Sequence, residues 1–284
     1  MLSERKIGFI GCGNIANAII SGFISSKKIK SSQIFLLDPN KNTLESLKRE
    51  FSGINISENL QSLVDNSELI FICIKPHILS QVLSEIKDLN MEGDLKSGNK
   101  VLISVCAGKT ISDILNEFQS NDIHCIRVMP NLTLSICQGS WLYYENPVAK
   151  FTKYKQNNSN EITEILSSCG TVYNIDENIF SHCTSISGCG PGFFSNIAHH
   201  FIQSGIKIGI PEDLAKKLVI ETMYGTSKLL FESSIDPKVF QSKVSTPGGS
   251  TQAGIEVLED RLIGKVFQDC LHSSLDKCNQ LSKN

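Results

Sequence analysis

The sequence has no marked excess of charge of either sign and no long apolar run. Its 284 residues include 27 Lys and Arg and 29 Asp and Glu, giving a formal net charge of -2. We expect neither nucleic acid nor an anionic membrane as a partner, because both attract strongly basic proteins. The longest apolar stretches, residues 69–74 and 101–107, have about a third of the length that spans a bilayer. Strand-like sequence begins at Lys6, which leaves no room for the apolar part of a signal peptide, so we expect a cytoplasmic protein.

Patterns typical of metal sites and disulfide frameworks are also missing. The 10 Cys are spread from Cys12 to Cys278, and none forms a C-x-x-C pair. The 6 His show no H-E-x-x-H spacing, and the side chains of adjacent His199 and His200 would point in different directions on a helix. Free Cys often fills a hydrophobic core, and a cytosolic chain keeps such thiols reduced. We therefore expect no bound metal.

Strand-like and helical patterns alternate through the first part of the chain, which predicts an α/β fold. Short apolar runs of this kind suit strands that are covered on both faces, and amphipathic stretches with helical spacing lie between them. Regular alternation of the two predicts a doubly wound parallel sheet. A polar interval at 150–160 is expected to be a surface loop. The predicted strands are residues 7–10, 34–37, 69–74, 101–106, 125–129 and 171–175.

The sequence changes character after about residue 176. Helical patterns cover residues 193–202, 212–231, 251–258 and 262–281, without a convincing strand among them. We therefore predict two domains, an α/β domain at 1–176 and an all-helical domain at 177–284. The helices carry more apolar residues than a monomeric domain of this size needs to bury, which predicts a homodimer. These residues are Phe193, Phe194, Ile197, Phe201, Ile202, Leu218, Val219, Met223, Leu229 and Leu230.

The first predicted strand runs directly into a glycine-rich turn and a helix, the context of a dinucleotide-binding loop. Gly11 would permit the tight turn, Gly13 would let the backbone approach a pyrophosphate, and Ala16 would allow close helix packing. The helix N-terminus would supply N–H donors and the positive end of a dipole. A structural turn without a ligand is the alternative. The prediction is a Rossmann-type domain that binds NADPH or NADH through Gly11, Cys12, Gly13, Asn14, Ile15 and Ala16.

Asp38 ends the second predicted strand, where the ribose hydroxyls of an adenosine would lie. Its carboxylate would bind the 2′-hydroxyl of NAD and repel the 2′-phosphate of NADP. Lys41 is close enough in sequence to offset that repulsion. The preference between NADPH and NADH therefore stays open.

Further candidates follow the next three predicted strands, because ligands of open α/β sheets lie beyond the carboxyl ends of the strands. Lys75 and Asn131 could form hydrogen bonds to the ribose or the nicotinamide, and the small residues Ala107 and Gly108, after the second of these strands, could pack against a flat ring. Solvated loop residues are the alternative interpretation. The predicted cofactor contacts are Ile74, Lys75, Pro76, Cys106, Ala107, Gly108 and Asn131.

A second glycine-rich segment precedes the predicted helix at 251–258. Exposed N–H groups at a helix N-terminus form an anion site suited to a small carboxylate, and the neighbouring hydroxyls could donate to a bound ligand. An ordinary N-cap is the alternative, because Ser and Thr are favoured there without a ligand. The predicted substrate-binding residues are Ser245, Thr246, Gly248, Gly249, Ser250 and Thr251.

The segment 244–259, Val-Ser-Thr-Pro-Gly-Gly-Ser-Thr-Gln-Ala-Gly-Ile-Glu-Val-Leu-Glu, closely resembles the signature of the pyrroline-5-carboxylate reductases. Five shorter motifs resemble the same family in the same order, and the resemblance covers about residues 6–280. Departures from the family pattern are Thr133, Cys189 and His199, none of which is an expected catalytic residue. The five motifs lie at 11–16, 74–77, 104–108, 127–131 and 187–191.

The resemblance implies reduction of 1-pyrroline-5-carboxylate to L-proline by NADPH or NADH, the last step of proline biosynthesis. It implies an N-terminal Rossmann domain and a helical domain that interleaves with a second subunit, with larger rings such as a decamer. By position, Thr251 matches the threonine assigned to the imine nitrogen and is the expected catalytic residue, and residues 245–250 match the carboxylate loop. Asn59 falls near an asparagine that contacts the cofactor.

Two other functions remain as alternatives. One is another Rossmann reductase, such as a 3-hydroxyacid or prephenate dehydrogenase, which needs a Lys or His base that the loop at 245–251 does not supply. The other is a catalytically silent nucleotide sensor. Such a sensor would have no reason to combine a dinucleotide loop with a carboxylate loop and Thr251.

Overall fold

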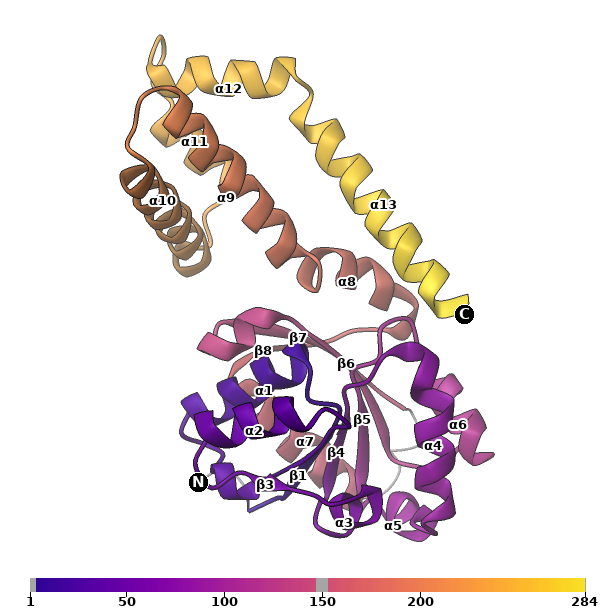
Figure 1. Ribbon diagram of the computed structural model, residues 1–284. Helices are drawn as coiled ribbons and strands as arrows, with labels where there is room; N and C mark the ends of the chain where they lie inside the picture. The colour runs from indigo at the N-terminus through magenta and orange to yellow at the C-terminus, as the bar shows by residue number, and fades with distance from the viewer. Residues whose placement is uncertain (1–3, 147–152, 284) are drawn as a thin grey trace. The chain divides into compact units, whose positions relative to one another are not determined.

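The structure is a computed structural model that describes residues 4–146 and 153–283. The chain forms two compact units, one of Met1–Cys189 together with Ser274–Asn284 and the other of Gly190–Ser273 (Figure 1). The first contains the sheet, and the second is helical. The sequence analysis predicted domains at 1–176 and 177–284, with the boundary where strand patterns give way to helical ones. That division into domains stays a prediction.

The first unit is built on an eight-stranded sheet in the order β3-β2-β1-β4-β5-β6-β7-β8. Neighbouring strands are parallel except β6 and β7, which are antiparallel. The predicted doubly wound, predominantly parallel fold is confirmed, whereas β3 and β7 were missing from the sequence prediction. The strands are β1 (Ile7–Ile10), β2 (Ile34–Leu37), β3 (Asn55–Ile56), β4 (Leu69–Ile72), β5 (Val101–Ser104), β6 (Cys125–Pro130), β7 (Gly139–Glu145) and β8 (Gly170–Asn174).

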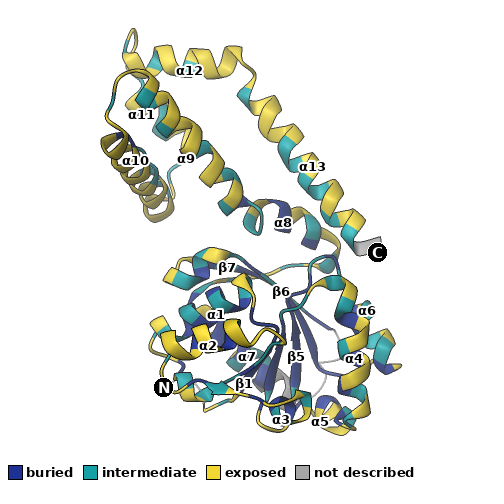
Figure 2. Cartoon of the chain, viewed as in Figure 1, coloured by how far each residue is buried: buried dark blue, intermediate teal, exposed yellow. Residues whose placement is uncertain are grey.

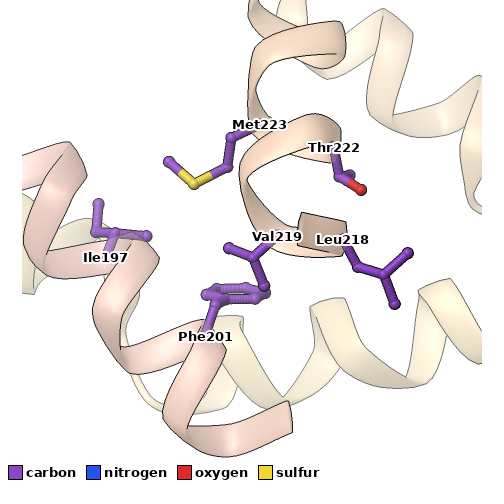
Figure 3. A pocket seen from close by; sticks show the side chains of 6 residues that line it. All are labelled: Ile197, Phe201, Leu218, Val219, Thr222 and Met223. Carbon is purple, nitrogen blue, oxygen red and sulfur yellow. The ribbon is translucent and has the colours of Figure 1, made fainter. Parts of the chain in front are cut away.

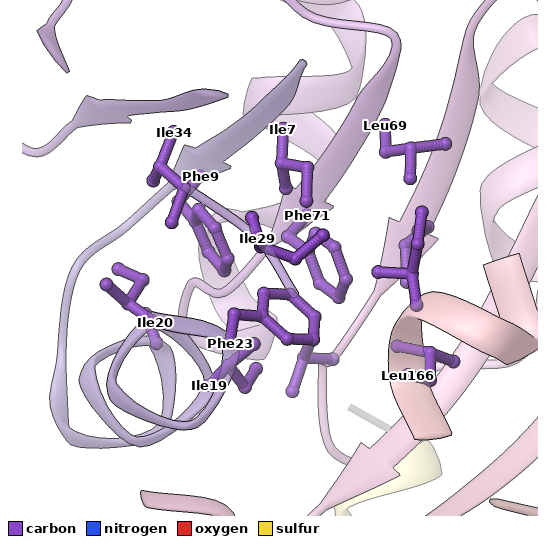
Figure 4. Close-up of a cluster of buried hydrophobic side chains, with 14 of the residues drawn as sticks. Ile7, Phe9, Ile19, Ile20, Phe23, Ile29, Ile34, Leu69, Phe71 and Leu166 are labelled. Carbon is purple, nitrogen blue, oxygen red and sulfur yellow. The ribbon is translucent and has the colours of Figure 1, made fainter. Parts of the chain in front are cut away.

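Helices cover both faces of the sheet, which is why the central strands are mostly apolar. Alternate residues of β5 show the arrangement: Val101 and Ile103 belong to one buried cluster and Leu102 to the other. Figure 4 shows the first cluster, in which the Phe9 and Phe71 rings stack with centroids 4.9 Å apart. Figure 2 shows that the burial extends along the strands. The covering helices are α1 (Asn14–Ser25), α2 (Lys41–Glu50) and α7 (Lys153–Ser167) on the first face, and α3 (Leu60–Asp65), α4 (Leu79–Asp88), α5 (Glu92–Ser97) and α6 (Ile111–Phe118) on the second.

The loop predicted at 150–160 is wrong from residue 153 onward, where α7 begins; residues 150–152 lie outside the described part of the chain. The polar composition indicated a loop, but polar side chains here bond within the fold. Asn158 is buried, donates from Nδ2 to the Gly98 carbonyl at 2.7 Å, and accepts from Arg5 Nη2 at 2.7 Å. Ile162 and Ile165 then pack into the core.

A buried polar network fixes the end of β7. The Glu145 carboxylate receives hydrogen bonds from the Tyr143 hydroxyl at 3.0 Å and from Ser159 of α7, and it pairs with His124. Burial alone raises the pKa of Glu145, but the hydrogen bonds from His124 and Ser159 outweigh burial and lower it. The network therefore stabilises the ionised carboxylate and joins β7 to α7 and to the segment before β6.

The helical part of the chain confirms the four predicted helices and adds two that the pattern missed, α8 and α11. None of the helices within residues 4–146 and 153–283 is long and apolar enough to cross a lipid bilayer. The helices are α8 (Phe180–Ser187), α9 (Gly190–Lys207), α10 (Glu212–Ser233), α11 (Pro237–Val244), α12 (Ser250–Asp260) and α13 (Ile263–Lys283).

Candidate active site

The turn between β1 and α1 has the geometry of a phosphate-binding loop. Gly11 has φ +86°, and a Cβ there would lie 2.7 Å from the Cys73 carbonyl oxygen, so both the conformation and the packing require glycine. Gly13 is the N-cap of α1, and a Cβ built on it would meet nothing within 4 Å. Ala16 is fully buried. The loop therefore has an open approach to a helix N-terminus, which suits a pyrophosphate.

Asp38 lies beside this loop, as the sequence predicted. β2 pairs with β1 so that Leu37 is opposite Ile10, and the next residues leave the same edge of the sheet. Asp38 Oδ2 accepts a hydrogen bond from the Cys12 backbone N–H at 2.7 Å, and Oδ1 accepts one from the Asn40 N–H at 2.8 Å. Burial and the Asp38 charge raise the pKa of the Cys12 thiol to about 12. The carboxylate thus both orders the loop and brings a negative charge to it.

The carboxyl ends of β4 and β5 bring the next two predicted segments together. Ile72 of β4 is opposite both Ile10 of β1 and Ser104 of β5, so the three strands end at one edge. Beyond that edge, the Cys106 thiol donates to the Ile74 carbonyl at 3.4 Å, which joins the two loops. Gly108 has φ +78°, a conformation that favours glycine. Lys75 is exposed, and Pro76 begins a short 3-10 turn.

Two of the predicted cofactor contacts, Asn131 and Asn59, form hydrogen bonds within the protein. Asn131 Nδ2 donates to Ser140 Oγ at 3.2 Å and to the Ser187 carbonyl at 3.1 Å, and its Oδ1 accepts from the Thr133 hydroxyl at 2.7 Å. Asn59 caps α3, because its Oδ1 accepts from the Ser62 N–H at 2.9 Å. That they contact the cofactor stays a prediction. For Asn131, a hydrogen bond to the cofactor would have to replace one of the bonds described above.

The second glycine-rich segment lies in the helical unit and connects α11 to α12. Gly248 has φ +72°, and Gly249 is the N-cap of α12, a cap without a side-chain hydrogen bond. Ser250 and Thr251 are the first two helical residues, and both are exposed. The alternative of an ordinary Thr251 cap is therefore wrong: α12 begins one residue earlier than predicted, and the Thr251 hydroxyl is not its cap.

Gln252 organises this turn, and sequence reasoning did not identify it. Its Oε1 accepts from the Gly248 N–H at 2.8 Å, while the Gly249 N–H is used in a turn to the Thr246 carbonyl at 2.9 Å. The Gly249 N–H is therefore not available to a ligand, whereas those of Ser250 and Thr251 have no acceptor within a helix. Gln252 is the third helical residue, the position of Gln or Glu in a capping box, so the spacing could have indicated it.

An apolar cavity lies between α9 and α10 of the helical unit (Figure 3). Its volume is about 340 Å³, and Phe201 is 60% exposed although its ring lies against the cavity. Phe194 on α9 and Phe231 on α10 are exposed by 63% and 74%. Apolar exposure of this extent is typical of a protein–protein interface. The residues that line the cavity are Ile197, Phe201, Leu218, Val219, Thr222 and Met223.

Comparisons with known proteins give matches both to the sheet-containing part of the chain and to its helical part. The family model described as pyrroline-5-carboxylate reductase dimerisation matches residues 177–281, and the model described as NADP oxidoreductase coenzyme F420-dependent matches residues 6–108. Pyrroline-5-carboxylate reductase 3 of Danio rerio is 32% identical over 257 residues, covering 90% of this chain and 84% of the relative. The pyrroline-5-carboxylate reductase of Staphylococcus haemolyticus is 29% identical over 282 residues, 98% of each chain. The crystal structure of Plasmodium falciparum pyrroline carboxylate reductase with NADP bound has a TM-score of 0.84, 25% identity and 98% coverage of each chain.

Proposed function

The chain belongs to the pyrroline-5-carboxylate reductase family, and from this premise we propose that it reduces the C=N bond of 1-pyrroline-5-carboxylate to give L-proline, with NADPH or NADH as hydride donor. The observation that carries the proposal is the exposed N-terminus of α12, whose N-cap Gly249 makes no side-chain hydrogen bond, with the Thr251 hydroxyl beside it. A carboxylate and an imine nitrogen on one small ring match these two groups. The reaction is the last step of proline biosynthesis, and a cytoplasmic location is part of the proposal.

The sheet unit would hold the dinucleotide. The loop from Gly11 to Ala16 would bind the pyrophosphate, and Asp38 would accept from the ribose hydroxyls. Ala107 and Gly108, small residues in the loop after β5, would leave space for the nicotinamide ring. When bound, the reduced cofactor supplies the hydride. Because Asp38 already accepts two backbone hydrogen bonds, part of its negative charge is compensated, which supports use of both NADPH and NADH.

The loop of the helical unit would hold the substrate. The N–H groups of Ser250 and Thr251 and the hydroxyls of Ser245 and Thr246 would bind the carboxylate, since anions are stabilised at a helix N-terminus. Gly248 would keep the turn open, and its bond to Gln252 would fix the turn before the substrate arrives. This pre-organisation lowers the loss of conformational entropy on binding.

Thr251 would act on the ring nitrogen. As C5 receives the hydride, the nitrogen changes from an imine to an amine and gains proton affinity, so a hydroxyl that contacts it stabilises the transition state more than the substrate. The side chain is exposed at the second position of α12 and is free of a capping role. A protonated imine is already polarised, and positioning by this loop supplies the main part of catalysis.

The helical unit would also form a homodimer. The exposed side chains of α9 and α10 and the cavity between the two helices provide an apolar surface that a second copy of the chain can cover. A ring of dimers, such as a decamer, is the larger assembly that we propose. Light scattering should give at least a dimer at micromolar concentration, and a stable monomer would contradict this part of the proposal.

The activity is tested by the loss of 340-nm absorbance when the protein, NADPH and 1-pyrroline-5-carboxylate are mixed, followed by detection of L-proline. Parallel reactions with a 3-hydroxyacid or prephenate, in the oxidative direction with NADP or NAD, test the other reductases. We expect turnover only with the cyclic imine. Binding of NADPH without turnover of any substrate would instead favour the nucleotide sensor.

A further inference from the structure

Glu177 connects three elements of the sheet unit at a point that the expected chemistry does not use. It begins the 3-10 turn Glu177–Ile179 that leads into α8. Its Oε1 accepts a hydrogen bond from Arg127 Nη1 of β6 at 3.0 Å and another from the backbone N–H of Ile111 at 2.9 Å. The second bond is made to the first residue of α6, so one carboxylate oxygen joins β6, α6 and the entry to α8.

Arg127 makes this connection with a buried charge. Its side chain is 5% exposed, and its guanidinium carbon lies 4.1 Å from the centroid of the Phe180 ring, the first residue of α8. Arg127 Nε has no hydrogen-bond partner among the described residues. Burial lowers the pKa of Arg127 more than the pairing with Glu177 raises it. The Glu177 side chain is 20% exposed, so the buried charge is that of Arg127, and ion pairs that bury a charge often give no more stability than apolar side chains of similar volume. A role in fixing a particular arrangement explains the pair better than stability does.

The arrangement that it fixes includes the predicted nicotinamide loop. The loop after β5 carries Cys106, Ala107 and Gly108 and ends at Thr110, the N-cap of α6. Asp113 completes a capping box with Thr110 from within the helix, whereas Glu177 binds the next N–H from 66 positions away. The end of the loop is thereby tied to a distant segment of the chain.

The same strand holds both ends of α8. Arg127 contacts its first residue, Phe180, and Asn131, which follows β6 directly, donates to the carbonyl of its last residue, Ser187, at 3.1 Å. A helix that is held at both ends by one strand cannot rotate or slide without breaking one of the two contacts. Glu177 extends this fixed helix to α6 and so to the loop that precedes α6.

We propose that Arg127 and Glu177 form a positioning pair that fixes the β5–α6 loop to α8 and thereby sets the orientation in which the nicotinamide of NADPH or NADH binds. The inference rests on the proposed function for the identity of the dinucleotide. It predicts that loss of the pair changes the placement of the cofactor more than it changes the stability of the fold. Because misplacement by about 1 Å is enough to slow a reaction by up to about 100-fold, the expected effect on kcat is about 10- to 100-fold.

The experiment compares two variants with a control. Glu177→Gln keeps an acceptor for the Ile111 N–H and removes the charge, and the double variant Arg127→Met, Glu177→Met replaces the pair by apolar side chains. Glu92→Gln is the control, because it breaks an exposed ion pair to Lys96 on α5. The dissociation constant for NADPH, kcat, KM for the imine and the melting temperature are measured on each full-length protein.

We expect the double variant to melt close to the wild-type temperature, to bind NADPH several-fold more weakly and to lose kcat by about 10- to 100-fold. The KM for the imine should change little, and Glu92→Gln should match the wild type in every measurement. A folded double variant with wild-type NADPH affinity and kcat would overturn the proposal. If the double variant does not fold, Glu177→Gln decides: reduced NADPH affinity and kcat support the positioning role, and unchanged values overturn it. Inactivity of the wild type would contradict the proposed function alone, because NADPH affinity is measured without substrate.

Discussion

Replacing Thr251 by Val tests the proposed catalytic role with little disturbance of the fold. Thr251 is the second residue of α12, its side chain is exposed, and the helix is capped at Gly249. Val has the same shape as Thr and nearly the same helix propensity, so the free energy of unfolding should change by less than about 0.5 kcal/mol. A capping threonine would instead lose about 1 kcal/mol.

The effect on turnover should be much larger. The hydroxyl would contact a nitrogen that becomes more basic as the hydride arrives. Its loss should therefore raise the free energy of the transition state more than that of the bound substrate. We expect kcat/KM for 1-pyrroline-5-carboxylate to fall about 10- to 1000-fold, which corresponds to about 1.4 to 4 kcal/mol, with kcat reduced as well as KM raised. Affinity for NADPH should be unchanged, because the predicted dinucleotide-binding loop at residues 11–16 belongs to the other compact unit.

The assay measures steady-state kinetics, NADPH affinity and melting temperature on one preparation. Ser250→Ala is the matched comparison in the same helical turn: the Ser250 N–H remains and only its hydroxyl is lost, so this variant should raise KM by less than Thr251→Val does and leave kcat near the wild-type value. Wild-type kcat in Thr251→Val, with or without a change in melting temperature, would refute the reasoning and leave the residue without a catalytic role.

Three further predictions follow from the described contacts. Asp38→Ser should shift the NADPH to NADH ratio of kcat/KM toward NADPH by about 1 to 2 kcal/mol, the scale of a close, partly exposed like-charge contact; an unchanged ratio would mean that Asp38 does not face the ribose. Gly249→Val should mainly raise the KM for the imine, since a Cβ there would lie 2.6 Å from Thr246 Oγ1, and kinetics with wild-type KM would contradict an anion site at this turn. Glu145→Gln should lower the free energy of unfolding at pH 7 by about 1 to 3 kcal/mol. Because the folded pKa of Glu145 is lowered, its contribution is present above the ordinary value of 4.5 and is lost as the pH falls through the folded value, so urea titrations between pH 7 and pH 3 should show a weaker pH dependence in the variant.

The parallel core of the sheet was predictable because both faces of its strands are covered. β1, β4 and β5 are buried at every residue. A strand that is covered on both faces has a nearly continuous apolar run, which can be recognised from the sequence alone. β7 was not predictable by the same rule, since it returns antiparallel to β6 where strand–helix alternation predicts a helix. The polar half of α7 indicated a loop because its buried amide, Asn158, finds its partners at Arg5 and Gly98, far away in the sequence.

The candidate site divides in a similar way. Gly11 and Asp38 were predicted correctly in their placement because a strand, a turn and the end of the next strand specify it locally. The capping alternative at Thr251 depended on where α12 begins, a boundary that a sequence pattern defines only within a few residues. The contacts of Glu177 with Arg127 and Ile111 span 50 and 66 positions, and a single sequence holds no signal for them.

The thiol of Cys12 makes the phosphate loop observable in solution. Cys12 is 2% exposed, and the raised pKa lowers the fraction of its thiol that is ionised and reactive, so an alkylating reagent should modify it only slowly while the loop stays in place. Because the thiol is buried, we expect modification to require the turn to open, which would make the rate of alkylation a measure of the opening equilibrium. A dinucleotide bound against the backbone of this turn would stabilise its closed form and slow the labelling of Cys12 in proportion to the occupancy of the site. The labelling rate would then measure cofactor binding without any turnover.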